Sequence, residues 1–243
     1  MKKVLGLAIS FCMLFGTVFA KGVYDGDIQL HLGLGLDSAK AVAEVPYLEQ
    51  SVKETLESGS TTVDFELSTW HLFDVNDLIG VGFNLGFSGG IGKTSKMVLT
   101  EEFRGITFEL DSVPSDQLSI AGHFNGLIGP AVGFTLNDVI KFDLAVGFAY
   151  GLDLYSYEYE NYDPYSRSSG VDTFMIFGAG FGFDVQAKFF PKSVVSPVLG
   201  YRLSSIFSSE VISSNEMIEL LSGYWNSVNY IANEIYLGVS FNW

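Results

Sequence analysis

Apolar and polar residues alternate along most of this chain with a period of two residues. The clearest example is segment 140–154, in which Ile140, Phe142 and Leu144 share one face while Lys141 and Asp143 occupy the other. Successive side chains of a β-strand point to opposite faces, so this period predicts strands rather than helices. The same alternation predicts eight strands, within residues 27–36, 62–73, 78–88, 118–134, 140–154, 177–190, 196–207 and 234–243.

The connections between the predicted strands alternate in length. Those after the second, fourth and sixth strands are short, with the sequences DVNDL, TLNDV and PKSVV. Those after the first, third, fifth and seventh strands are polar and about twenty residues long, at 37–60, 88–116, 156–172 and 208–229. Short turns at one end and long loops at the other are typical of outer-membrane β-barrels. The first and fourth long connections also fit short amphipathic helices.

The composition of the two faces decides between two architectures. Eight alternating strands build either a membrane-spanning barrel with apolar residues outside or a soluble, ligand-binding barrel with an apolar interior. The less apolar face consists mostly of Gly, Ala, Ser and Asn with few charges, which suits a narrow lumen filled by side chains better than a surface in water. We therefore predict an all-β fold, an eight-stranded antiparallel up-and-down transmembrane β-barrel with short periplasmic turns and long extracellular loops.

The N-terminal segment indicates export. Two lysines near the start precede the apolar segment 4–15, and a cleavage site of the small-residue type follows at Ala20. This arrangement is typical of a secretory signal peptide. We therefore expect the signal at residues 1–20 and a single barrel domain at residues 21–243.

Charge and cysteine content narrow the range of functions. Loss of the predicted signal leaves 11 of the 13 Lys and Arg residues against 28 Asp and Glu, and changes the formal net charge from −15 to −17. An acidic exported chain is a poor candidate for binding nucleic acid, which requires clustered Lys and Arg. The one cysteine, Cys12, lies in the predicted signal, so we expect neither disulfides nor thiol chemistry in the mature chain.

The last ten residues, EIYLGVSFNW, form an alternating strand that ends on an aromatic residue. Such a strand resembles the C-terminal signal by which bacterial outer-membrane proteins are recognised for barrel assembly. With the signal peptide and the eight-strand plan, the whole mature chain resembles the small outer-membrane barrels of the OmpW, OmpX and OmpA-transmembrane-domain kind, or an uncharacterised family of small surface barrels. The resemblance implies the outer membrane of a diderm bacterium, export through the secretory pathway, and two partners, outer-membrane lipid and the barrel-assembly machinery. It assigns the assembly signal to Ile235, Leu237, Val239, Phe241 and Trp243.

Charged residues of the predicted inner face suggest a cluster in the lumen. Counted across the short turn near Ser193, Asp184 and Arg202 are equidistant, and counted across 208–229, Arg202 and Glu234 are nearly so. A buried guanidinium must be paired, and its planar fork suits two carboxylates. We therefore expect an inward Asp184–Arg202–Glu234 cluster, with a structural role in closing the lumen preferred over gating. Further polar lumen residues are expected at His31, Glu66, His123, Lys141, Asp143 and Lys188.

No motif indicates an enzyme or a cofactor site. The stretch GFSGGIGKTS is similar to a phosphate-binding loop, but position 87 is Phe where the motif needs Gly, and no amphipathic helix follows Thr94. His31, His71 and His123 lie on separate strands without metal-ligand spacing, and no serine stands in a nucleophile-elbow sequence. We therefore expect no enzyme activity, no cofactor and no metal.

The sequence leaves two candidate functions. In the first, a barrel with a side-chain-filled lumen presents four acidic, tyrosine-rich surface loops to an extracellular partner, although solvated loops without a partner explain the same composition. The alternative, which the OmpW resemblance implies, is a narrow channel for small or hydrophobic solutes. A channel requires a continuous lumen past Arg202. An outer-membrane enzyme and a soluble ligand-binding barrel rank below both.

Overall fold

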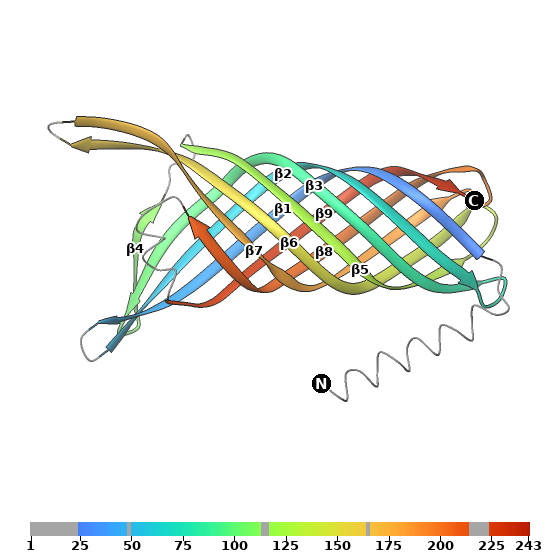
Figure 1. The fold of residues 1–243 in the computed structure, drawn as a ribbon, viewed down its shortest axis with the longest axis horizontal. Helices are drawn as coiled ribbons and strands as arrows, with labels where there is room; N and C mark the ends of the chain where they lie inside the picture. Colours follow the sequence, from blue (N-terminus) through green and yellow to red (C-terminus); the bar gives the residue numbers. More distant parts are fainter. Residues whose placement is uncertain (1–23, 48–49, 113–116, 164–165, 214–223) are drawn as a thin grey trace.

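The computed structural model describes residues 24–47, 50–112, 117–163, 166–213 and 224–243, nearly all of them in β-strands (Figure 1). The predicted signal peptide lies outside the described residues. No helix among the described residues is long and apolar enough to cross a membrane. The strands are β1 (Tyr24–Tyr47), β2 (Gln50–Asp74), β3 (Ile79–Phe103), β4 (Ile106–Ser112), β5 (Leu118–Thr135), β6 (Ile140–Asp163), β7 (Ser166–Phe189), β8 (Val195–Ser213) and β9 (Trp225–Asn242).

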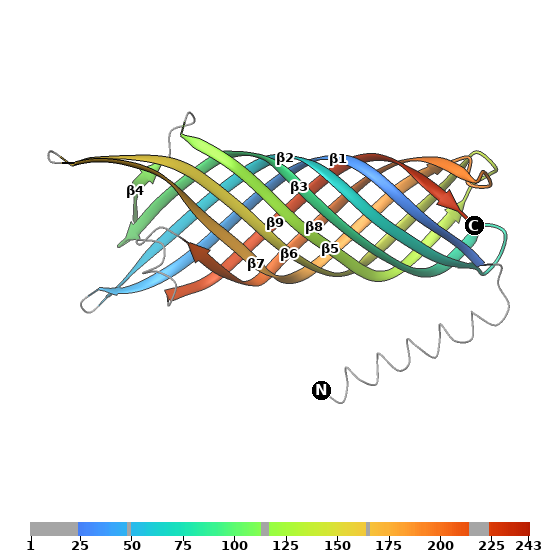
Figure 2. The same cartoon turned by 45° about the horizontal axis from the view of Figure 1, so that its top comes forward.

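Eight of these strands close into a ring, which confirms the predicted antiparallel barrel. Each strand pairs with its neighbours in the chain, β4 excepted, and β1 pairs with both β2 and β9. Strand β4 pairs with β3 and forms a hairpin outside the ring. Figures 1 and 2 show a long barrel whose short turns and C-terminus lie at one end, called the turn end here, and whose long hairpins extend from the other, called the hairpin end.

Two of the three short turns form where the sequence places asparagine. In the β2–β3 turn, Asn76 Oδ1 accepts hydrogen bonds from the backbone N–H groups of Leu78 and Ile79, at 2.8 and 2.9 Å. In the β5–β6 turn, Asn137 Oδ1 accepts the equivalent pair from Val139 and Ile140, at 2.8 and 2.9 Å. Asparagine favours such turns because its side chain satisfies backbone donors that the strands leave free. These local bonds join antiparallel strands at the turn end.

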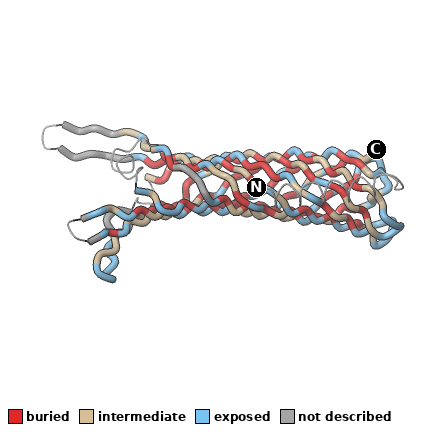
Figure 3. The backbone as a smooth tube through the Cα atoms, turned by 60° about the horizontal axis from the view of Figure 1, so that its bottom comes forward, coloured by how far each residue is buried: buried red, intermediate tan, exposed pale blue. Residues whose placement is uncertain are grey.

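A band of apolar side chains surrounds the turn-end part of the ring. On β1 the outward residues from Ile28 to Leu36 are all apolar, and Leu30, Leu32 and Leu34 are 51%, 54% and 63% exposed. The C-terminal strand contributes Ile235, Leu237, Val239, Phe241 and Trp243 to the same outer surface. Figure 3 shows exposed and buried residues alternating along the strands. We call this surface the apolar band.

The prediction of four long loops is wrong for most of the residues concerned, because these segments continue the strands. Strand β1 continues to Tyr47, β2 begins at Gln50, and β3 continues to Phe103. The pairs β6–β7 and β8–β9 extend beyond the predicted strands in the same way. The helix expected in the first connection is therefore strand instead, while residues 214–223 of the fourth lie outside the described part. The strands continue because the inner face becomes apolar there, so that pairing also buries hydrophobic side chains.

This inner apolar face forms a core within the hairpin half of the barrel. Its larger members are Leu56, Met97, Leu99, Leu118, Leu127, Tyr155, Tyr157, Phe174, Ile176, Ile206, Val211, Val228 and Tyr230. Leu118 and Ile120 are two positions apart, so simple alternation predicts that both face outward, but Leu118 is buried and Ile120 is exposed. A register shift between Leu118 and Ala121 turns Leu118 inward, because one extra residue reverses the alternation.

Irregular pairing is concentrated in the same half. In the described pairings, the register shifts lie at or beyond the hairpin-side edge of the apolar band, between Val42/Ala43, Gly59/Ser60, Leu99/Thr100, Leu118/Ala121 and Phe177/Ala179. Beneath that edge the ladders run without a shift.

Candidate functional site in the barrel interior

Charged side chains fill the interior behind the apolar band. The fully or nearly buried ones comprise eight acids, Asp27, Asp37, Asp64, Glu66, Asp143, Asp153, Asp184 and Glu234, against three bases, Lys141, Lys188 and Arg202. A buried charge is tolerated only where it is paired and hydrogen-bonded. These residues form three groups along the barrel axis, and each group joins strands across the lumen.

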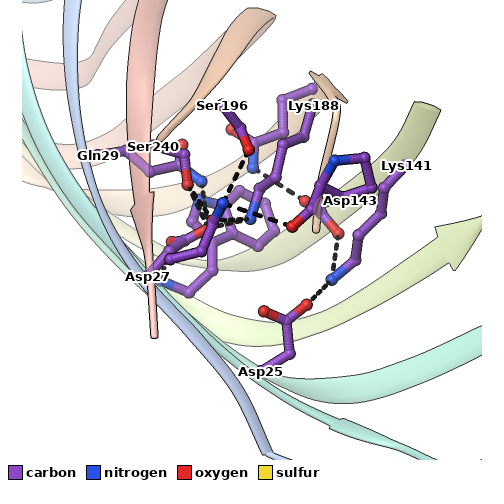
Figure 4. Close-up of polar contacts among 12 residues, drawn as sticks. Asp25, Asp27, Gln29, Lys141, Asp143, Lys188, Ser196 and Ser240 are labelled. Carbon is purple, nitrogen blue, oxygen red and sulfur yellow. Dashed lines mark hydrogen bonds and ion pairs between the residues drawn. The ribbon is translucent and has the colours of Figure 1, made fainter. Parts of the chain in front are cut away.

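The first group lies at the turn end and is drawn in Figure 4. Lys188 of β7 donates to Asp27 of β1, and Lys141 of β6 donates to Asp25 of β1. Asp27 also accepts from the Ser240 hydroxyl at 2.9 Å, and Asp143 lies 3.6 Å from the Lys141 ammonium. We call this group the turn-end cluster. Its ion pairs close the lumen by linking opposite walls of the barrel.

A central cluster is organised around Arg202, which is only 2% exposed. The guanidinium Nη2 of Arg202 donates to Glu66 and, at 2.6 Å, to Asp184. Asp184 also accepts from the Tyr236 hydroxyl at 2.5 Å, and Glu66 Oε2 lies 3.1 Å from His31 Nδ1. The His31 and Tyr236 rings stack with their centroids 4.2 Å apart. Five strands contribute one such side chain each and thereby fix one another across the lumen.

A third cluster lies toward the hairpin end. His123 Nδ1 is 2.9 Å from Asp37 Oδ2, and His123 Nε2 is 3.6 Å from Asp64 Oδ1. The Asn125 amide donates to the Tyr230 hydroxyl at 2.9 Å, and Tyr230 belongs to the apolar core of the hairpin half. A cavity of about 10 Å³ separates the third cluster from Arg202. Such a volume holds about one water molecule, so it is far too small to pass a solute.

All nine charged or histidine residues expected in the lumen lie on the inner wall. They are Asp184, Arg202, Glu234, His31, Glu66, His123, Lys141, Asp143 and Lys188. The strand register places Asp184 and Glu234 opposite Arg202, as the counting across the connections requires. The second carboxylate that Arg202 contacts is, however, Glu66. Glu234 Oε1 is buried without a hydrogen-bond partner among the described residues.

Several interior residues were not identified from the sequence. Asp27, Asp37 and Asp64 lie on the inward parity of β1 and β2, which is the signal that could have identified them. Tyr236 appears in the sequence as one of many tyrosines, and only its position between two apolar outward residues indicates that it points inward. Among the described residues, no group of three or more His, Cys, Asp or Glu side chains is arranged to hold a metal ion.

Comparisons with known proteins give structural likenesses at low sequence identity. No protein-family model matches the chain, and no curated protein matches its sequence. Among solved structures, Ail, the attachment invasion locus protein of Yersinia pestis, is similar with 12% identity and a TM-score of 0.39, covering 90% of this chain and 99% of Ail in its complex with the heparin analogue sucrose octasulfate. The outer-membrane protease OmpT of Escherichia coli matches with 11% identity and a TM-score of 0.38, covering 90% of this chain and 96% of OmpT. Neisserial surface protein A matches with 12% identity and a TM-score of 0.33, covering 87% of this chain and 96% of that protein.

Proposed function

We propose that this protein is a non-enzymatic, surface-exposed β-barrel of the outer membrane of a diderm bacterium. It is exported through the secretory pathway and inserted by the barrel-assembly machinery, which recognises strand β9 by its outward apolar residues and terminal Trp243. The barrel is an anchor with a closed lumen, and the hairpins present the surface that contacts an extracellular partner.

The apolar band on a closed ring is the observation that carries this proposal. Large apolar side chains are widely exposed on it, including Phe65 at 70% and Ile91 at 75%. Soluble monomers rarely expose so much contiguous apolar surface. A closed ring leaves no unpaired strand edge, which is the condition for crossing a bilayer as β-structure. On β1 the outward apolar residues extend over nine positions, from Ile28 to Leu36, which matches the length of a tilted membrane-spanning strand.

The filled interior supports an anchoring role over a channel. The turn-end cluster, the central cluster and the apolar core succeed one another along the axis, and the cavity between Arg202 and His123 holds about one water molecule. Opening a path would require the ion pairs of Arg202 with Glu66 and Asp184 to separate in a region of low dielectric. The narrow channel for small or hydrophobic solutes is therefore the second candidate.

Single-channel recording distinguishes the two candidates. The mature chain, refolded and inserted into a planar bilayer, is expected to give no discrete openings. Formation of the barrel is checked first by its heat-dependent shift in electrophoretic mobility. Discrete openings that change when Arg202→Ala is introduced would instead establish the channel, with the central cluster as its constriction.

Exchange of the β6–β7 hairpin tip for a short turn tests the surface role. Cells that carry this variant are expected to lose binding of the extracellular partner while the barrel stays folded.

A further inference from the structure

A hollow of about 620 Å³ opens on the outer wall of the barrel, just beyond the apolar band. Its lining includes the small residues Ser38, Gly59 and Ser95 and two lysines, Lys40 and Lys96, and is completed by Ala39, Glu57, Ser58, Ser205, Asn229 and Ile231. Hydroxyl groups beside two ammonium groups are donors suited to an anion rather than to an apolar ligand.

The strand pairing builds this hollow. Ser38 of β1 lies opposite Gly59 of β2, and because Gly59 has no side chain the Ser95 hydroxyl approaches the wall at this point. The register of β2 and β3 shifts between Gly59 and Ser60, so that Thr94 pairs with Ser60 and Lys96 with Gly59. The extra residue, Ser95, therefore faces outward together with Lys96. A β-bulge re-aims side chains in this way, and here it brings a hydroxyl and an ammonium to the same side of the wall.

A single carboxylate holds the two lysines together. Glu57 Oε1 lies 3.0 Å from the Lys40 ammonium, and Glu57 Oε2 lies 2.9 Å from that of Lys96. Hydrogen bonds from Lys96 and Lys40 lower the pKa of Glu57 to about 2, so its charge persists at neutral pH. The trio still carries one net positive charge, and the exposed Lys93 lies three positions before Lys96 on β3.

Beyond the apolar band, the outward lysines of this acidic chain lie in one sector of the wall. Where the structure describes their side chains, the outward lysines beyond the apolar band are on β1, β2 and β3, at Lys40, Lys53, Lys93 and Lys96. Lys93 follows Ile91, which is 75% exposed in the apolar band on β3, by two positions, and Lys40 follows Leu36 of β1 by four. The hollow therefore lies at the level where lipid headgroups would meet a barrel whose band occupies the hydrocarbon layer.

We propose that this hollow binds the phosphate group of an anionic lipid headgroup in the outer leaflet. Lys40 and Lys96 contact the phosphate oxygens, Ser38 and Ser95 donate to it, and Glu57 holds the lysines in place when no lipid is bound. The inference rests on the proposed outer-membrane location. Because Glu57 repels a phosphate that enters between the lysines, removing its charge strengthens binding.

The test titrates diphosphoryl lipid A into the refolded protein in a neutral detergent and counts bound lipid by native mass spectrometry. Each lysine near an anionic lipid contributes about a fivefold increase in affinity. The Lys40→Ala/Lys96→Ala variant is therefore expected to bind about thirtyfold more weakly. Lys53→Ala is the matched control, since Lys53 also pairs with a glutamate on β3, Glu102, but lies outside the hollow. Its affinity is expected to equal that of the wild type.

Glu57→Gln supplies a second readout that a purely structural ion pair would not give. It is expected to bind about fivefold more tightly, since one negative charge leaves the site. Unchanged affinity in both the double-lysine variant and Glu57→Gln would overturn the inference. So would equal affinity for dephosphorylated lipid A, or equally tight binding of inorganic phosphate, which would assign the site to a soluble anion.

The barrel itself is monitored separately. A chain that does not give a heat-modifiable band contradicts the proposed function, whereas a folded barrel whose variants bind alike contradicts only the headgroup site. If the double-lysine variant does not fold, the gain expected in Glu57→Gln still decides the question.

Discussion

The same strands build two regions with opposite polarity. Behind the apolar band, the inner wall carries most of the buried charges together with a small apolar cluster around Trp70 and Leu72, and the outer wall carries leucine, isoleucine and phenylalanine. In the hairpin half, the inner wall is largely apolar, and the outer wall is mixed, with lysine, glutamate and serine beside exposed apolar residues such as Val171 and Ile212. Strand β9 shows both, since Ile235 and Leu237 face outward whereas Val228 and Tyr230 face inward. No change in strand parity accompanies this reversal on β9, because the even-numbered residues from Val228 to Ser240 face inward.

The reversal shows that the surrounding solvent, rather than the fold, decides which face is apolar. In a bilayer the outer wall needs no further burial, so the interior is free to use ion pairs for specificity. In water the outer wall must be polar, so hydrophobic packing moves inside. The two halves should therefore respond differently to the same kinds of substitution.

Arg202→Ala is expected to have the largest effect. It leaves Glu66 and Asp184 as unpaired charges in the membrane half, which costs about 4 kcal/mol of the free energy of unfolding. Urea unfolding of the protein in phosphatidylcholine vesicles, followed by tryptophan fluorescence, measures this. The compensated variant Arg202→Met/Glu66→Gln/Asp184→Asn is expected to regain most of the loss. A single variant as stable as the wild type would show that charges do not hold this half together.

The outer walls are compared by adding one arginine to each half. Leu32, 54% exposed, lies midway along the apolar part of β1, and Val171, 56% exposed, lies on the outer face of the β6–β7 hairpin. Leu32→Arg is expected to cost about 3 kcal/mol, because the guanidinium enters the centre of the bilayer. Val171→Arg is expected to change stability by less than about 0.5 kcal/mol. Equal losses in the free energy of unfolding, measured in the same urea assay, would contradict the assignment of Leu32 to lipid and Val171 to water.

Leu56→Ala probes the apolar core of the hairpin half. Leu56 is 3% exposed, and its truncation is expected to cost about 2 kcal/mol. The loss is local, because the membrane half remains held by its own clusters and ladder. Amide hydrogen exchange in the β1–β2 hairpin should accelerate about thirtyfold, with little change around Arg202. The outward variant Thr55→Ala serves as the control, and protection lost uniformly over the barrel would contradict two independent halves.

The smallest effect is expected for Glu57→Gln on stability. Lys96 and then Lys40 lower the pKa of Glu57 from 4.5 to about 2, so the stabilisation is complete above about pH 4.5 and is lost as the pH falls toward 2. Because the pair is exposed, it is worth less than about 1 kcal/mol at neutral pH. Wild-type and variant unfolding curves should therefore differ slightly at pH 7 and coincide near pH 2. If the stability difference between the wild type and Glu57→Gln grows as the pH falls, the pKa of Glu57 is raised rather than lowered.

Alternation predicted the parts of the fold in which the two faces contrast most. In segment 140–154, phenylalanine and valine alternate with lysine, aspartate and glycine. This contrast predicts both the strand and which of its side chains point into the barrel. In segment 37–60 the inward residues include Ala39, Ala41 and Ser58, whose small side chains contrast little with their outward neighbours. The strand extension there depends on Leu56 and on partners from distant strands, which a local pattern does not reveal.

The central cluster shows a second limit of sequence reasoning. Counting across connections relates only strands that pair, so it places Asp184 and Glu234 beside Arg202 on β7 and β9. Glu66 reaches Arg202 from β2, which does not pair with β8. Contacts across the lumen depend on the tilt and closure of the ring, and these are properties of all eight strands together.

The placement of the register shifts has a consequence for how such a chain can vary over evolution. A one-residue insertion behind the apolar band would exchange the inner and outer faces of everything between it and the next turn, placing charges in lipid. Beyond the band, bulges such as the one at Ser95 already absorb an odd residue, and the ladder resumes with its faces restored. Changes in chain length are therefore tolerated at the hairpin end and eliminated at the turn end. The part of the molecule exposed to the surroundings is thus the part whose length is free to diverge.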